Sequence, residues 1–488
     1  MKRWVLLTLG LAGIAVAAAG QEGGYGPTWW APGEGRVFPA TADYDNSQGT
    51  LRVLLSGGAM ATEGHAFFTP QGPDGRACVT CHQPADGMAL SAQTARQRWD
   101  ETGGKDSLFA AYDGMNCPTL PRGERASHSL LLDHGLIRIE RPWPPKDGNG
   151  HPVKPDFTIE VVRDPWGCES GKVYGLKAGN ISVYRRPRPV ANLTYATAAG
   201  FAYDPKEGMA LRKDAHGGWM AGNLMADGRA DTLDAQMNEA GATHLRLTAV
   251  MTDAERAQIA DFERRVFTAQ QTSRVGGALD HGATGGAEAL RDGAPGRLGS
   301  IGTPVWSEFA GWETASDGTP EQNAWRQSVA RGAKVFRDRT FLIDNSAGIN
   351  SPIGFGNPVR NSCVFCHNMS QTGMDVAPGQ VDIGTTVEPY ADAAPHLPLF
   401  RITCRVPHRH YGRVIYTTDP GFALTTGRCA DVGRVTIQNM RGLSGRAPYF
   451  ANGSAKDAAA VVDYYDRRYR IGYTAQERQD LINLLNAL

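Results

Sequence analysis

The sequence predicts a mainly α fold with extensive irregular loops and little β-structure. Two capping boxes, which begin at Thr252 and Thr474, each precede apolar residues at helical spacing. A third apolar stripe predicts a helix that begins near Asp457 and carries Tyr465 on its buried side. Sustained strand alternation is scarce, and residues 157–162 are the main candidate.

The composition indicates irregular chain around large buried groups. The 488 residues include 59 glycines and 29 prolines, and only 41% are hydrophobic. This length predicts more than one domain. The 50 basic and 50 acidic residues leave no net charge, so the sequence suggests neither nucleic acid nor an anionic membrane surface as a partner.

Two pentapeptides, which begin at Cys78 and Cys363, both have the pattern Cys-x-x-Cys-His. At this spacing two thiols can add to the vinyl groups of one porphyrin, and the adjacent imidazole then lies under its iron. A zinc site fits less well, because zinc needs four ligands and the two pairs lie far apart in the chain. The sequence therefore predicts two covalently bound haem c groups. The predicted attachment and iron-ligand residues are Cys78, Cys81, His82, Cys363, Cys366 and His367.

The N-terminus predicts a signal peptide over residues 1–20. Lys2 and Arg3 precede an apolar stretch, residues 4–16, which is followed by the small residues 17–19. A membrane anchor is the alternative, but the stretch is shorter than the ~20 residues that a spanning helix needs. The expected location is the bacterial periplasm, with no membrane span after signal removal.

Four further cysteines fit an oxidising compartment. We expect two disulfides, Cys117–Cys168 and Cys404–Cys429, because these pairings keep the closed loops short and cross no domain boundary. Four thiols allow three pairings, and free buried thiols are the alternative.

Both halves carry a Gly-x-x-x-Phe lead-in upstream of the motif, Gly64 to Phe68 and Gly332 to Phe336, which suggests internal duplication. Residues 271–320 are rich in small residues with little apolar periodicity, as in a linker. The expected organisation is a signal peptide (1–20), an N-terminal extension (21–50), an N-terminal haem domain with an insertion (51–270), a linker (271–320) and a C-terminal haem domain (321–488).

These features resemble the dihaem bacterial cytochrome c peroxidases and their relatives in the MauG branch, in which each half is a cytochrome c-like unit. The resemblance covers most of the mature chain, although the long segment 100–180 is typical of a larger member. Besides the haem motifs, the matching residues are Asp227-Gly228-Arg229, Gln236, Thr418 to Gly421, Thr426-Gly427, Leu443, Arg446 to Phe450 and Asn452-Gly453.

The resemblance implies different tasks for the two haems. The N-terminal haem, on His82, leaves one face open to hydrogen peroxide, and the C-terminal haem stores and relays electrons. Peroxide cleavage needs a group that moves a proton and a donor that polarises the O–O bond. Gln236 matches the distal glutamine of the family, and His244 stands near the position of its usual glutamate. A surface amide and a structural histidine are the alternatives.

The sixth ligand of the C-terminal haem departs from the simplest peroxidases. Ala451 and Tyr465 stand where family members have a histidine and the axial ligand. We expect a Tyr465 phenolate, a MauG-like choice that would lower the haem potential. Alternatively, Tyr465 is a core aromatic residue and Met374 or Met440 is the ligand.

The family also places an aromatic residue between the haems, and Tyr184 lies nearest to the expected stretch. Arg185 and Arg186 are candidates to pair with haem propionates, with a solvated basic loop as the alternative. The resemblance further implies one calcium ion, here on the backbone carbonyls of Arg446 and Pro448, without independent support from an Asp-rich loop. For the aromatic position between the haems, the alternatives to Tyr184 are Trp99, Trp166 and Trp219.

The expected function is that of a periplasmic dihaem peroxidase that reduces hydrogen peroxide to water. Its electrons would come from a small periplasmic cytochrome or cupredoxin. One alternative is a MauG-like oxidase that modifies a partner protein, and another is a non-catalytic electron-transfer cytochrome with two six-coordinate irons. The sequence leaves the oligomeric state open, a homodimer included.

Overall fold

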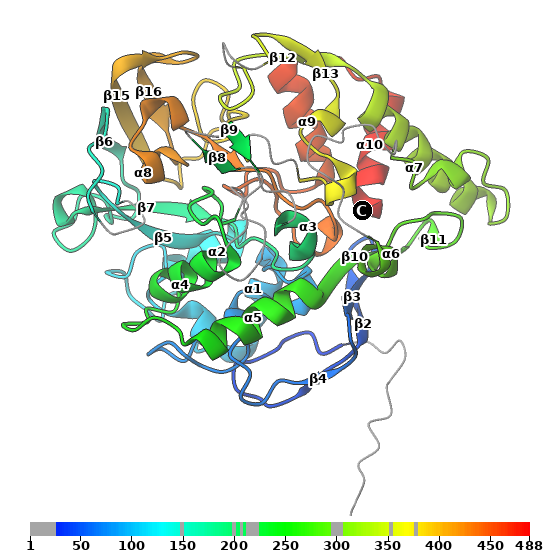
Figure 1. The fold of residues 1–488 in the computed structure, drawn as a ribbon, viewed down its shortest axis with the longest axis horizontal. Helices are drawn as coiled ribbons and strands as arrows, with labels where there is room; N and C mark the ends of the chain where they lie inside the picture. Colours follow the sequence, from blue (N-terminus) through cyan, green and yellow to red (C-terminus); the bar gives the residue numbers. More distant parts are fainter. Residues whose placement is uncertain are drawn as a thin grey trace, which may run out of the picture.

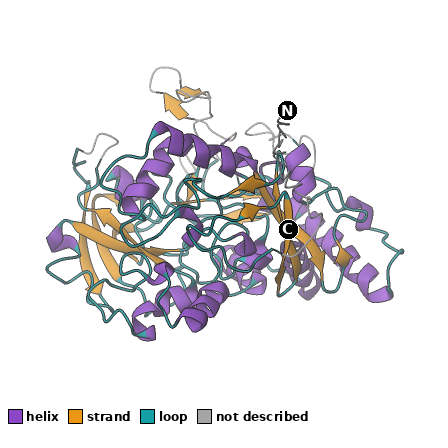
Figure 2. Ribbon diagram, turned by 90° about the horizontal axis from the view of Figure 1, so that it is seen from below, coloured by secondary structure: helices purple, strands orange, loops and turns teal. Residues whose placement is uncertain are grey.

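A computed structural model of the chain describes residues 26–146, 151–197, 202–204, 208–210, 224–293, 306–350, 355–374 and 379–488. The predicted signal peptide and Trp219 lie outside these ranges. Figure 1 shows the course of the chain, and Figure 2 its secondary structure from below.

The structure is 32% helical and 20% strand, so the prediction of a mainly α fold with little β-structure is wrong. The strands form small antiparallel sheets at several places in the molecule (Figure 2). They escaped prediction for two physical reasons. Strand β10 (Val266–Ser273) is buried on nearly its whole length and shows no alternation, and many other strands have only two or three residues.

The two largest sheets have the strand orders β11-β10-β3-β2 and β16-β15-β6. The predicted strand at residues 157–162 is confirmed, since it lies within β6. The strands of these sheets are β2 (Thr41–Asn46), β3 (Gly49–Leu55), β10, β11 (Gly277–Ala278), β6 (Phe157–Arg163), β15 (Leu399–His408) and β16 (Gly412–Thr417). The two-stranded pairs are β1 (Val37–Phe38) with β4 (Met60–Ala61), β5 (Ile137–Pro142) with β7 (Asn180–Arg185), β8 (Ala202–Asp204) with β9 (Gly208–Ala210), β12 (Phe341–Ile343) with β13 (Val359–Asn361), and β14 (Gln380–Val381) with β17 (Val435–Thr436).

The helices confirm the local sequence signals. Both predicted capping boxes are formed, and the Asp457 side chain caps a third helix by accepting a hydrogen bond from the Ala460 N–H. The α-helices are α1 (Ala92–Thr102), α2 (Ser129–His134), α3 (Leu193–Thr197), α4 (Leu233–Thr243), α5 (Asp253–Arg265), α6 (Ala287–Asp292), α7 (Pro320–Asp338), α8 (Ala423–Thr426), α9 (Ala458–Tyr469) and α10 (Ala475–Ala487).

Helices α7, α9 and α10 pack together in the C-terminal half, and α4 packs on α5 in the N-terminal half (Figure 1). Residues 271–320, expected as a linker, include the end of β10, all of β11 and helix α6. Strand β10 follows α5 directly and pairs with β3, while the Gln270 N–H donates to the carbonyl of Leu488 at 3.4 Å. This sheet therefore adjoins the C-terminal helices.

The two Gly-x-x-x-Phe lead-ins have different structures. Gly332 lies on α7, where a Cβ atom would stand 2.1 Å from the carbonyl oxygen of Asp480, so glycine allows α7 and α10 to approach closely. Gly64 instead lies in a turn with φ of +69°, and open space surrounds its Cα. The shared spacing is therefore not one structural motif.

Both predicted disulfides are confirmed. Cys117 is joined to Cys168 and Cys404 to Cys429, with Cα–Cα distances of 5.6 Å and 5.8 Å. None of the helices in the described part of the chain has the length and hydropathy that a membrane crossing requires.

Candidate functional site

Each Cys-x-x-Cys-His motif forms a 3-10 turn that begins at its first cysteine. The His82 N–H donates to the Cys78 carbonyl at 3.1 Å, and the His367 N–H donates to the Cys363 carbonyl at 3.0 Å. These turns place both cysteines and the histidine of each motif on the wall of one cavity. A covalently bound haem needs this arrangement.

The two motif histidines are oriented in the same way. The Nδ1 atom of His82 lies 3.1 Å from the Met88 carbonyl, and that of His367 lies 3.0 Å from the Gly373 carbonyl. A hydrogen bond from Nδ1 leaves Nε2 to bind a metal. Burial lowers the pKa of His82 to about 4 and also lowers that of His367, so both imidazoles are neutral, as ligation requires.

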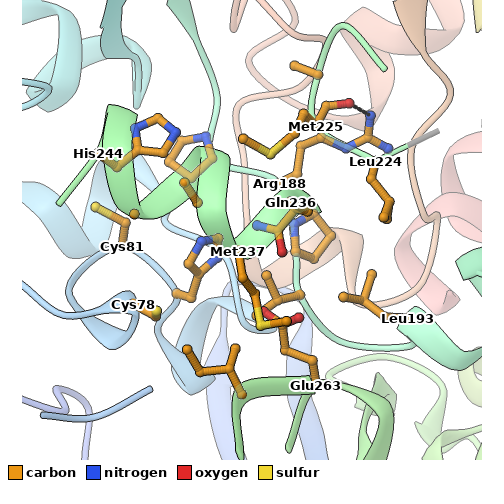
Figure 3. A pocket seen from close by; sticks show the side chains of 18 of the residues that line it. Cys78, Cys81, Arg188, Leu193, Leu224, Met225, Gln236, Met237, His244 and Glu263 are labelled. Carbon is orange, nitrogen blue, oxygen red and sulfur yellow. Dashed lines mark hydrogen bonds between the residues drawn. The ribbon is translucent and has the colours of Figure 1, made fainter. Parts of the chain in front are cut away.

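The first cavity brings together His82, Gln236 and His244. Figure 3 shows Gln236 and His244 on its wall. The Gln236 Oε1 atom is buried and has no hydrogen-bond partner among the described residues. His244 follows α4, and its Nδ1 lies 3.0 Å from Asp113 Oδ2, which also accepts a hydrogen bond from Arg76. The wall thus offers an unpaired amide oxygen and an imidazole held by a carboxylate.

The second cavity is lined by both Tyr465 and the motif histidine His367. The phenol oxygen of Tyr465 lies 3.4 Å from Nε2 of His367. Burial raises the pKa of Tyr465 well above its usual value, so this phenol keeps its proton unless a metal binds it. Of the alternative ligands, Met440 lines this cavity, whereas Met374 lines the first one.

Helices α4 and α9 are equivalent walls of the two cavities. Thr232 and Asp457 are their N-caps, and from these caps Gln236 corresponds to Val461 and Ala240 to Tyr465. All four of these helix residues line their cavities. The first cavity therefore has a methyl group where the second has a phenol. Alanine cannot bind iron, so Ala240 could not serve as a counterpart of Tyr465 in the first cavity.

Three arginines on the cavity walls, the buried Arg186 and Arg446 and the half-buried Arg188, fit haem propionates. None forms an ion pair with a carboxylate of the described residues, and their guanidinium groups donate mainly to backbone carbonyls, as Figure 3 shows for Arg188 and Met225. Burial lowers the pKa of Arg186 to about 10, that of Arg188 to about 9 and that of Arg446 to about 10. Buried cations of this kind need anions, and a haem carries two carboxylates.

Arg185, the other arginine considered for propionates, has a different role. It is fully buried and pairs with Asp419 at 2.6 Å and with Asp227 at 2.7 Å. Its charge is already neutralised within the protein, so Arg185 is not available to a propionate.

The wall between the cavities consists of Arg186, Pro187 and Asn439, which line both. Tyr184 lines neither cavity, because its hydroxyl donates to the Asn116 carbonyl at 2.6 Å in a separate apolar cluster. The tryptophan rivals Trp99 and Trp166 also line neither cavity, and Trp219 lies outside the described residues.

The structure disfavours a calcium ion on the Arg446 carbonyl. That oxygen accepts a hydrogen bond from the Arg186 guanidinium at 2.6 Å, and a second cation there would be repelled. The carbonyl of Ala451 accepts a hydrogen bond from the Arg186 N–H at 2.8 Å. No cluster of three or more acidic, histidine or cysteine residues within the described ranges is arranged to hold a metal ion.

Sequence reasoning missed several residues that line the cavities. Ala240 and Glu263 line the first cavity, and Arg188 and Arg446 are cations on the cavity walls that form no ion pair with a carboxylate of the described residues. Two sequence alignments could have identified Ala240 and Glu263. The segment that begins at Thr252 can be aligned with the segment that begins at Thr474, and the segment of α4 with that of α9. The sequence gives no comparable signal for the two arginines, because burial of a long cationic side chain depends on tertiary packing.

Comparisons with known proteins add little to this geometry. No protein-family model matches the chain, and no curated protein is significantly similar to it. One similar solved structure is titled "Crystal structure of a MauG-like protein associated with microbial copper homeostasis". It is 16% identical, covers 61% of this chain and 80% of its own, and has a TM-score of 0.30. At this TM-score the likeness supports no conclusion about the chain.

Proposed function

We propose that this protein is a dihaem c-type peroxidase that reduces hydrogen peroxide to water in the cavity of His82. The observation that carries the proposal is the difference between Ala240 and Tyr465 at equivalent helix positions, because the first cavity has no ligand group at the position of Tyr465. A haem on each motif would supply the iron that binds peroxide and the electrons that reduce it.

The residues of the first cavity suit this reaction. The unpaired Gln236 oxygen can accept a hydrogen bond from bound peroxide and so orient it. His244, fixed through Nδ1 by Asp113, keeps Nε2 for proton exchange with the leaving oxygen. The reaction consumes one peroxide, two electrons and two protons and yields two waters.

Electrons are proposed to enter through the second cavity from a small cytochrome or cupredoxin. Transfer between the cavities is supported by Arg186, Pro187 and Asn439, which line both of them. The two disulfides support a periplasmic location, where such bonds persist.

Electron paramagnetic resonance of the isolated holoprotein tests the proposal. We expect one high-spin ferric iron, from the open cavity, and one low-spin iron, together with a rapid spectral change on addition of peroxide. A reduced cytochrome or cupredoxin should then be oxidised with two equivalents per peroxide. Two low-spin irons and no response to peroxide would instead identify an electron-transfer cytochrome.

A MauG-like oxidase is the second candidate, and the position of Tyr465 opposite His367 favours it. An anionic oxygen ligand favours higher oxidation states of iron, which modification of a partner protein requires. The electron source separates the two candidates. An oxidase would react with peroxide equally fast but would oxidise small donor proteins poorly.

A further inference from the structure

Glu263 is a buried carboxyl group on the wall of the first cavity. It lies on α5, is 3% exposed, and its Oε2 atom has no hydrogen-bond partner among the described residues. Figure 3 shows its side chain pointing toward Met237 of α4. Ionisable groups are rarely buried without a partner, because desolvation of the charged form is costly.

Comparison of α5 with α10 shows that this acid is a local departure. Helices α5 and α10 both have 13 residues and begin with the same capping box, at Thr252 and Thr474. Counted from these caps, Glu263 corresponds to Leu485, which lines the second cavity. The fold thus accepts leucine at this position, and packing alone does not explain a glutamate.

The other charged groups on the same wall all have partners. Arg76 pairs with Asp113, which also contacts His244, and Arg229 pairs with Asp227 and Glu239. The guanidinium groups of Arg186 and Arg188 donate to carbonyls. Glu263 alone among these charged cavity residues has no such contact within the described part of the chain.

The electrostatic neighbours of Glu263 are few. Arg264, an exposed residue of the same helix, favours the carboxylate, but burial outweighs it and raises the pKa of Glu263 to about 8. Across the cavity, its charge acts on Cys78, a residue that no longer titrates once it carries a haem. From α3 and α4, the apolar residues Leu193, Ala196 and Met237 line the same cavity.

Above about pH 8 the carboxyl group of Glu263 is ionised, and an electron that then enters this cavity adds one negative charge near it. In a medium of low dielectric constant such charges repel each other strongly, and a proton taken up by the carboxylate relieves the repulsion. We propose that Glu263 binds one proton when the haem of Cys78, Cys81 and His82 accepts one electron, so that reduction in this cavity is coupled to proton uptake.

The step balances. A one-electron donor is oxidised, the iron passes from ferric to ferrous, and one solvent proton forms the O–H bond of the Glu263 carboxylic acid. The proton then lies in the cavity where peroxide reduction consumes protons. This inference rests on the proposed haem at His82. Because Leu485 stands at the equivalent position of the second cavity and cannot bind a proton, the second haem should lack the coupling.

Spectropotentiometric titration of the holoprotein at several pH values near 8 tests the coupling. The potential of the first haem should fall as pH rises, by up to about 59 mV per pH unit, the one-electron equivalent of a tenfold change in proton activity. Glu263→Gln should remove most of this slope, and so should Glu263→Leu. The reciprocal Leu485→Glu variant should introduce a slope at the second haem.

An unchanged slope in Glu263→Gln would overturn the inference, because other groups would then bind the proton. The wild-type protein provides a second measurement that needs no variant. Recorded above pH 8, where Glu263 is ionised in the oxidised protein, its redox-difference infrared spectrum should gain the C=O stretch of a protonated carboxyl on reduction, and absence of this band would also overturn the inference. Failure of the proposed function looks different, since it appears as missing haem or absent peroxide reactivity.

Discussion

An Ala240→Tyr variant is expected to lose peroxide reduction by about 100-fold or more, which corresponds to about 2.7 kcal/mol in the activation barrier. Ala240 occupies the helix position at which the second cavity has Tyr465, and the first cavity is large enough to accept a phenol. The introduced tyrosine should occupy the open iron position above His82. Initial rates of peroxide reduction and the intensity of the high-spin ferric signal measure the two effects.

Two further variants separate ligation from steric blocking. Ala240→Phe fills the same space without a hydroxyl, so its iron should stay high-spin whatever its rate. Tyr465→Phe should convert the second iron to a high-spin form, because the phenol oxygen at 3.4 Å from His367 Nε2 is lost. An undiminished high-spin signal in Ala240→Tyr, or an unchanged spectrum in Tyr465→Phe, would refute the assigned ligand pattern.

The parts of the site that the sequence predicted are those fixed by local spacing. The capping boxes predict α5 and α10, because each box depends on residues within one turn of the helix. The disulfide pairing was also predicted correctly, from the rule that pairing within each half keeps the closed loops short.

Features that depend on long-range packing were not predictable in this way. Strand β7, which contains Tyr184 and Arg185, is buried on nearly every residue, so its pattern does not reveal which side faces a cavity. Glu263 lies in a helix sequence rich in charges and looks solvent-exposed until its helix is compared with α10. The small sheets depend on partners distant in sequence, as in the pairing of β3 with β10.

Asp227→Ala is expected to destabilise the protein by about 3–5 kcal/mol, the usual cost of leaving a buried charge without its partner. Asp227 is fully buried and accepts hydrogen bonds from Arg185 at 2.7 Å and from Arg229 at 2.8 Å. Arg229 also binds Glu239 of α4, so the cluster supports the helix that carries Gln236. Chemical denaturation of the holoprotein measures the loss, with Asp392→Ala in an exposed ion pair as the matched control.

The pH dependence gives this prediction a second test. Burial by itself would raise the pKa of Asp227, but Arg229, Arg185 and Arg141 together hold it well below its usual value. The unfolded chain therefore binds a proton at a higher pH than the folded protein does. The stabilising contribution of Asp227 is complete above the usual aspartate pKa of about 3.9 and is lost as pH falls toward the folded value. The deficit of Asp227→Ala should accordingly shrink at acidic pH. A deficit as small as that of Asp392→Ala, or one independent of pH, would show that the three arginines do not need this carboxylate.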